Sequence, residues 1–219
     1  MGYEFDDIYL SGSYQQIMGT GNLARQWAHI HRKMEKPFRT SNFESILEVG
    51  AGNAEHIKFV QSGWDTYFLT DLRVEPLVAE YQEDASVVIE AQDVQALTYA
   101  DDFFDRIIVT CVLAHVAEPF RALEEIKRVA RPGAKITIYL PCEPGIFLRL
   151  ARSLFTMPKN RRLGVKDPYL LHFREHIHYY PALNHYLNFV FSEAKIKTSY
   201  YPFKFLSWNF NLYKIYQIS

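Results

Sequence analysis

Short apolar runs alternate with amphipathic segments along most of the chain, which is the pattern of an α/β protein. The runs are nearly continuous in apolar residues, as in parallel strands covered on both faces. Five such strands are predicted at 45–49, 64–72, 86–91, 105–111 and 135–140. Two more, at 195–202 and 212–218, are expected to form an antiparallel pair. Apolar residues at helical spacing predict helices at 23–35, 54–60, 75–83, 120–130, 146–155 and 182–191, with a basic loop at 157–168.

A glycine turn follows the first strand and precedes a helix-compatible segment. Gly50 and Gly52 stand in this turn, where glycine tolerates positive φ and lets a ligand approach the backbone. Backbone N–H groups at the start of the helix would face that ligand. A dinucleotide fingerprint would need glycine or alanine where Glu55 stands, and the carboxylate of Glu48 would repel a pyrophosphate. A purely structural turn remains an alternative.

Two blocks of sequence are similar to one family. The stretch from Glu48 to Ala54 resembles motif I of the class I S-adenosylmethionine-dependent methyltransferases, E-x-G-x-G-x-G, with Ala54 in place of the third glycine. Residues 105–140 resemble that family's succession of strand, Leu-x-His-Val, proline, helix, Arg-Pro-Gly and strand. The resemblance covers about 45–140 and implies S-adenosylmethionine as cofactor and S-adenosylhomocysteine as product.

We therefore expect a single Rossmann-like α/β domain over 1–219, with a seven-stranded, mostly parallel sheet, helices on both faces and a helical cap insertion. Within it we expect an N-terminal helical segment at 1–40 and a cofactor-binding core at 45–140. The cap would occupy 141–181, and a C-terminal helix and strand pair 182–219.

The resemblance also implies roles for residues at the ends of the strands. Asp71 lies 21 positions after Gly50, where a carboxylate can accept both ribose hydroxyls; a capping role is the alternative. Asp93 would take the adenine amino group, or else be a solvated turn residue. An N-terminal tyrosine, Tyr14 or Tyr9, would lie near the methionine carboxylate. The predicted cofactor residues are Tyr14, Glu48, Gly50, Ala51, Gly52, Asp71, Leu72, Asp93, Val94 and Thr110.

Histidines supply the candidate catalytic groups. His115 follows the fourth strand, beside the expected methyl position, and imidazole titrates near neutrality. Its alternative role is to order the loop through backbone hydrogen bonds. His176 and His178 alternate along the chain, so we expect only one of them, His176, to enter the pocket. The nearby histidines match no zinc spacing, and we expect no metal.

Composition limits the classes of binding partner and the cell compartment that we expect. The formal net charge is −1 over 219 residues, which argues against a strongly electrostatic nucleic-acid binder. The two cysteines, Cys111 and Cys142, suit a reducing cytoplasm, and no apolar stretch reaches membrane-spanning length.

The favoured function is methyl transfer to an oxygen or nitrogen of a small molecule. One alternative is a catalytically silent S-adenosylmethionine-binding module or partner subunit. Another is a nucleotide-dependent oxidoreductase, against which Glu48 and Glu55 argue. The Asn-Pro-Pro-Tyr motif of amide- and base-modifying members is absent after the fourth strand.

Overall fold

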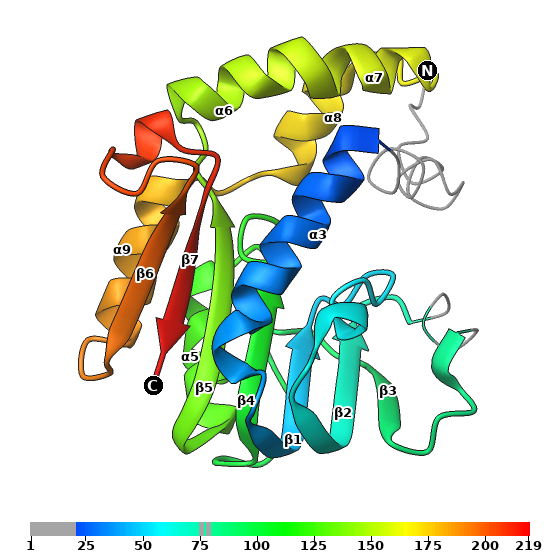
Figure 1. Cartoon of the computed structure of the whole chain (residues 1–219), viewed down its shortest axis with the longest axis vertical. Helices are drawn as coiled ribbons and strands as arrows, with labels where there is room; N and C mark the ends of the chain where they lie inside the picture. Colours follow the sequence, from blue (N-terminus) through cyan, green and yellow to red (C-terminus); the bar gives the residue numbers. More distant parts are fainter. Residues whose placement is uncertain (1–20, 75–76, 78–79) are drawn as a thin grey trace.

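Seven strands form one sheet in the order β3-β2-β1-β4-β5-β7-β6 (Figure 1). The computed structural model describes residues 21–74, 77 and 80–219. The four pairings among β1 to β5 are parallel, whereas β7 runs antiparallel to both β5 and β6. This arrangement confirms the predicted Rossmann-like sheet. The strands are β1 (Asn42–Val49), β2 (Gly63–Asp71), β3 (Val87–Ala91), β4 (Phe104–Thr110), β5 (Ala130–Pro141), β6 (Ile196–Tyr201) and β7 (Tyr213–Ile218).

Strand register aligns the carboxyl ends of the central strands. Val49, the last residue of β1, pairs with Thr70 of β2 on one side and Val109 of β4 on the other. The loops that leave these three strands therefore start at the same edge. Ligands of open α/β sheets bind outside this edge, where the direction of strand order reverses.

Helices cover both faces of the sheet (Figure 1). Helix α3 (Gly21–Glu35) places Ile30 and Met34 in one apolar core, together with Ile46 of β1. Helices α5 (Pro119–Val129) and α9 (Tyr180–Val190) build the other core, against Leu47. Successive β1 side chains thus serve opposite layers, as the pleat of a strand requires.

The segment after β5 folds into helices over the carboxyl edge of the sheet. Helix α6 (Ile146–Ala151), the π-helical turn η3 (Arg152–Thr156) and α7 (Met157–Arg162) follow one another without a break (Figure 1). Helix α8 (Pro168–Glu175) returns beneath them. The prediction of a loop throughout 157–168 was wrong. Pro158 is the second residue of α7, which follows the π-helical turn directly, so the proline marks the change from π-helix to α-helix and does not end the helical run.

The connection after the glycine turn also differs from the prediction. In place of a helix at 54–60, turns lead into the short 3₁₀ helix η2 (Ile57–Phe59). Ala54 adopts a φ of 51°, in the left-handed region, which is incompatible with starting an α-helix there. The predicted helix at 75–83 lies partly outside the described residues. Within that range, residues 77, 80 and 81 are described as helical.

Two further 3₁₀ helices complete the described elements, η1 (Lys36–Phe38) and η4 (Trp208–Phe210). Among the helices of the described ranges, none has the length and apolar character needed to cross a membrane.

Candidate active site

A cavity of about 860 Å³ lies between the carboxyl edge of the sheet and the helices that follow β5. Helix α3 contributes Trp27 and Ile30 to its wall, and the cap contributes Leu148 and Arg152. Most of the residues singled out from the sequence line this one cavity. They are Gly50, Gly52, Asp71, Leu72, Asp93, Val94, Thr110, His115 and His176.

The glycine turn forms the floor beside β1. Gly50 and Gly52 have φ values of 64° and 56°, in the left-handed region that favours glycine. A Cβ added to Gly50 would overlap Cγ2 of Val112, whereas one added to Gly52 would meet open space. The Gly52 N–H donates to Oδ2 of Asp71 over 3.0 Å. This bond joins the turn to the end of β2, so the two sequence signals belong to one structural unit.

Asp93 shapes the turn that follows β3. Its Oδ1 accepts hydrogen bonds from the backbone N–H and the side-chain amide of Gln95, at 2.9 and 3.0 Å. These bonds lower the pKa of Asp93, which is therefore ionised at neutral pH. The carboxylate lines the cavity while it also holds the loop, so the binding and turn roles considered from the sequence are compatible.

Two of the described residues predicted to bind the cofactor, Glu48 and Ala51, do not line the cavity. Glu48 is 1% exposed and accepts a 2.6 Å hydrogen bond from the Tyr67 hydroxyl, in the layer beneath α3. Burial raises the pKa of Glu48. Ala51 is buried, and its N–H donates to the Thr70 carbonyl at 2.9 Å. Tyr14, like Tyr9, lies outside the described residues.

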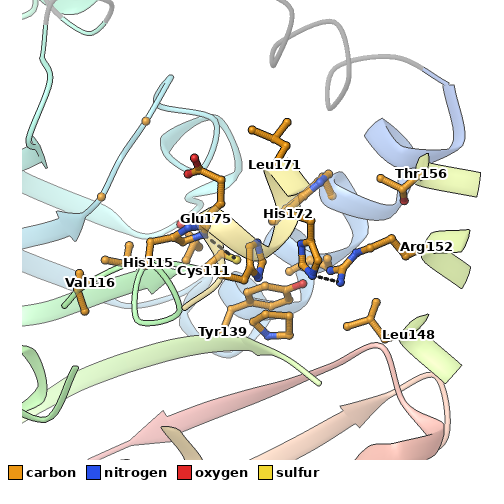
Figure 2. Close-up of a pocket in the computed structure, with 18 of the residues that line it drawn as sticks. Cys111, His115, Val116, Tyr139, Leu148, Arg152, Thr156, Leu171, His172 and Glu175 are labelled. Atoms are coloured by element: carbon orange, nitrogen blue, oxygen red, sulfur yellow. Dashed lines mark hydrogen bonds between the residues drawn. The ribbon is translucent and has the colours of Figure 1, made fainter. Parts of the chain in front are cut away.

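The imidazole rings of His115 and His176 are in edge-to-face contact in the cavity lining, with centroids 4.6 Å apart. His115 follows β4, and its Nε2 lies 3.9 Å from Sγ of Cys111 (Figure 2). His115 is exposed by surface area, but surrounding protein atoms partly desolvate its imidazole. This desolvation, together with the nearby His176, lowers the pKa of His115 to about 4, so its imidazole is neutral at pH 7.

Glu143 is the buried centre of a polar cluster under the cap. Its Oε1 accepts a hydrogen bond from the Arg152 guanidinium, and its Oε2 lies 2.9 Å from Nδ1 of His176. The latter two atoms are close but not aligned for a hydrogen bond. Burial alone would raise the pKa of Glu143, but His172, His176 and the charge of Arg152 outweigh it and hold that pKa well below its usual range.

Arg152 also donates to Nε2 of His172 over 2.7 Å, and Figure 2 shows the two side chains pointing toward each other above Tyr139. Because Nε2 accepts this bond, His172 is the neutral tautomer protonated at Nδ1. The ion pair and hydrogen bonds thus fix the cap helices to Glu143, at the end of β5.

The same cluster has the composition of a metal site. Donor atoms of Glu143, His172 and His176 all lie within 4.8 Å of one another, a grouping suited to a divalent cation. The guanidinium of Arg152, however, contacts both Glu143 and His172. A cation of the chain therefore already neutralises the carboxylate, and these contacts favour an ion-pair network over a metal centre.

Several residues of the site were missed in the sequence: Glu143, Arg152, Tyr139 and Trp27. One signal for Glu143 was available, because it follows the fifth strand at the edge where ligands of parallel sheets bind. Tyr139 could have been found in the same way, near the end of that strand. The roles of Arg152 and Trp27 depend on how helices pack over the sheet, which the local pattern does not specify.

Comparison with known proteins agrees with this geometry. Residues 47–138 match the model of a methyltransferase domain. A demethylmenaquinone methyltransferase of Renibacterium salmoninarum is 30% identical over 96 residues, 43% of this chain and 40% of that protein. A 2-phytyl-1,4-naphtoquinone methyltransferase of Nostoc punctiforme is 34% identical over 95 residues, 41% of each chain. The chain thus spans about two fifths of the length of these relatives.

A similar fold occurs in the N-methyltransferase NodS of Bradyrhizobium japonicum, solved with S-adenosyl-L-homocysteine. The TM-score is 0.56 at 12% identity, over 89% of this chain and 86% of that one. Sheet order, glycine turn and matched domain agree with one another. They make the chain similar to the S-adenosylmethionine-dependent methyltransferases over residues 47–138.

Proposed function

We propose that the protein transfers a methyl group from S-adenosylmethionine to a small-molecule acceptor. The observation that carries the proposal is a single cavity lined by both groups of residues. On one side lie the glycine turn and Asp71, and on the other lie His115 and His176. A cofactor floor and a set of proton-accepting groups therefore line the same cavity.

The residues present fit the cofactor. Gly52 presents backbone without a side chain to the cavity, and Asp71 and Asp93 supply carboxylate acceptors for hydroxyl and amino groups. When bound, S-adenosylmethionine supplies an electrophilic methyl group on a sulfonium. Trp27 and Tyr139 provide aromatic surface that excludes water from the same space. We assign the acceptor side to the cap at 141–181.

His176 is the group best placed to take a proton from the acceptor. Oε2 of Glu143 lies 2.9 Å from its Nδ1, and this carboxylate, which it shares with Arg152, is the negative charge next to the imidazole. His115 stays neutral at pH 7 and can accept a hydrogen bond from the acceptor or pass on a proton. This arrangement supports an acceptor hydroxyl or amine that must lose a proton during transfer.

A carbon acceptor is the second candidate. It is favoured by the relatives, two of which are named for demethylmenaquinone and 2-phytyl-1,4-naphtoquinone. Removal of a proton from a ring hydroxyl would raise electron density on the ring carbon, so the same base would serve. Mass spectrometry and NMR of the product distinguish a methyl group on oxygen, nitrogen or carbon.

The remaining partner assignments are also part of the proposal. A net charge of −1 and a cavity of about 860 Å³ favour a small molecule over a nucleic acid. Cys111 and Cys142 are both free thiols, which suits a reducing cytoplasm.

Two substitutions separate cofactor binding from catalysis. Asp71→Ala should weaken S-adenosylmethionine binding by about 2–4 kcal/mol in calorimetry, because two charge-assisted hydrogen bonds are lost. His176→Ala should lower turnover far more than cofactor affinity. Asp71→Asn is the matched control, since it keeps the shape and one acceptor oxygen that can still hold the Gly52 N–H.

The outcomes distinguish the alternatives. Binding of NAD without any response to S-adenosylmethionine would overturn the cofactor assignment. Cofactor binding without turnover on any hydroxylated or aminated acceptor would favour the catalytically silent module. Equal loss of affinity and turnover in both variants would contradict the division between cofactor floor and acceptor cap.

A further inference from the structure

The outer side of the cap exposes a row of large apolar side chains. Ile146, Leu150 and Leu154 follow at four-residue intervals and are 53%, 56% and 67% exposed. Residues at this spacing lie on one side of a helix. Folding alone would direct such a row toward the core, so its exposure calls for an external partner.

A neighbouring loop extends this apolar surface. Residues 203–210, between β6 and β7, carry four exposed apolar side chains, among them Phe205, which is 98% exposed. The loop lies against the start of α6, where the Phe147 and Phe203 rings are 5.7 Å apart. The cap face is defined here as Ile146, Leu150, Leu154, Phe203, Phe205, Leu206 and Phe210.

Basic side chains occur along the same cap segment and in the neighbouring loop. Residues 144–166 contain six basic side chains and no acidic one, although the whole chain has a net charge of −1. Arg149, Arg161 and Arg162 are exposed, and none of them makes an ion pair with a described residue. Lys204 adds a further exposed charge within the neighbouring loop.

We propose that the cap face binds the surface of a lipid bilayer that contains anionic lipids. Exposed leucine and phenylalanine beside arginine is the combination that holds amphipathic helices at a membrane interface. Apolar side chains enter the boundary between headgroups and acyl chains, while the arginines contact lipid phosphates. A nucleic acid would use the charges but leave the apolar row in water. A protein groove would match the apolar row but leave the exposed arginines without a role.

This docking would set the cavity mouth against the bilayer. Phe155 of η3 both lines the cavity and is 67% exposed, and Leu148 of the preceding helix α6 lines it too. The cap is therefore both the cavity wall and the surface that meets lipid. The proposal goes beyond methyl transfer and does not depend on it, because lipid binding is measured without cofactor or acceptor.

Vesicle co-sedimentation of the full chain tests the proposal. Vesicles made of equal parts phosphatidylcholine and phosphatidylglycerol should bind the protein, and pure phosphatidylcholine vesicles should bind it at least about tenfold more weakly. Two double variants separate the apolar contribution to vesicle binding from the electrostatic one. Leu150→Ser with Leu154→Ser should reduce partitioning at least about tenfold, and so should Arg161→Glu with Arg162→Glu.

Phe189→Ser is the matched control, because Phe189 is 65% exposed on α9 and lies outside the cap face. It should bind anionic vesicles like the unchanged protein, and circular dichroism should show that all variants are folded. Equal binding to both vesicle types, or unchanged binding in the two cap variants, would overturn the proposal. So would a stable dimer in light scattering that the leucine variant abolishes, because the cap face would then hold a second copy.

Discussion

The two glycines of the cofactor turn differ in how much room a side chain would have, because the Cγ2 methyl group of Val112 lies beside Gly50 only. Both have positive φ, so any L-residue in either place costs about 1–2 kcal/mol. Only at Gly50 would the added Cβ also overlap a neighbour, Cγ2 of Val112. The sequence motif treats the two positions alike, and the difference becomes visible only through a residue some sixty positions away.

Gly50→Ala should therefore destabilise the protein more than Gly52→Ala, as measured by urea unfolding. We expect Gly52→Ala to lower the free energy of unfolding by about 1–2 kcal/mol, and Gly50→Ala by more. Val112→Ala combined with Gly50→Ala is the control, because it removes the overlapping methyl group. Equal losses in the two single variants would contradict the packing argument.

Glu48 shows what a motif leaves undetermined at the residue scale. Its identity fits motif I, but the alternation of side chains along β1 directs it into the layer under α3, toward Tyr67. A sequence match reports that a residue type recurs at a position. It does not say whether the side chain reaches the ligand or supports the turn from behind.

At the scale of elements, α3 is held on the sheet by a buried polar network as well as by apolar contacts. Glu35 accepts hydrogen bonds from Arg106 of β4 at 2.7 Å and from Nε2 of His56 at 3.0 Å. The other ring nitrogen of His56, Nδ1, lies 2.8 Å from Nδ1 of His31. Burial, with the nearby His56, lowers the pKa of His31 to about 3. Helix α3 therefore docks best with His31 neutral.

This network predicts loss of stability in mild acid. The unfolded chain takes up a proton at His31 as the pH falls below about 6.5, whereas the folded protein resists protonation until about pH 3. The neutral His31 thus contributes fully to the free energy of unfolding above pH 6.5. About 2 kcal/mol of that free energy is lost by pH 5. Urea unfolding at pH 7 and pH 5 measures this loss.

His31→Gln should reduce the difference in unfolding free energy between pH 7 and pH 5 by about 2 kcal/mol, whatever its stability at pH 7. His185→Gln is the matched control, because His185 is exposed on α9. If His31→Gln leaves the pH dependence unchanged, the docking of α3 does not depend on the neutral imidazole.

Elements differed in how well the sequence predicted them, for physical reasons. Strands such as β4 were located because a buried parallel strand is a continuous apolar run. The prediction of a helix after the glycine turn was wrong, because the left-handed conformation of Ala54 depends on the turn and not on local propensity. The cap is fixed by Arg152 and Glu143, a contact that no periodicity encodes.

At the scale of the whole molecule, cofactor binding should be linked to global stability. A ligand that binds only the folded state stabilises it by about 2.7 kcal/mol at a hundredfold excess over its Kd. S-adenosylhomocysteine should therefore raise the thermal midpoint in proportion to the logarithm of its concentration. Asp71→Ala should need more ligand for the same shift.

NAD at the same concentrations is the control for that measurement and should leave the midpoint unchanged. A midpoint that does not respond to S-adenosylhomocysteine at any concentration would contradict a site in the cavity between sheet and cap.

The position of β7 has a consequence for the chain as it is made. Strand β7 fills the space between β5 and β6, but it follows β5 by about seventy residues in the sequence. At a synthesis rate of about 5–20 residues per second, the nascent chain waits several seconds before β5 can pair on that side. During that interval β5 offers an open edge to any passing strand, its own or another's. Production of this protein should therefore depend more on ribosome-associated chaperones than its finished sheet, in which β5 is paired on both sides, suggests.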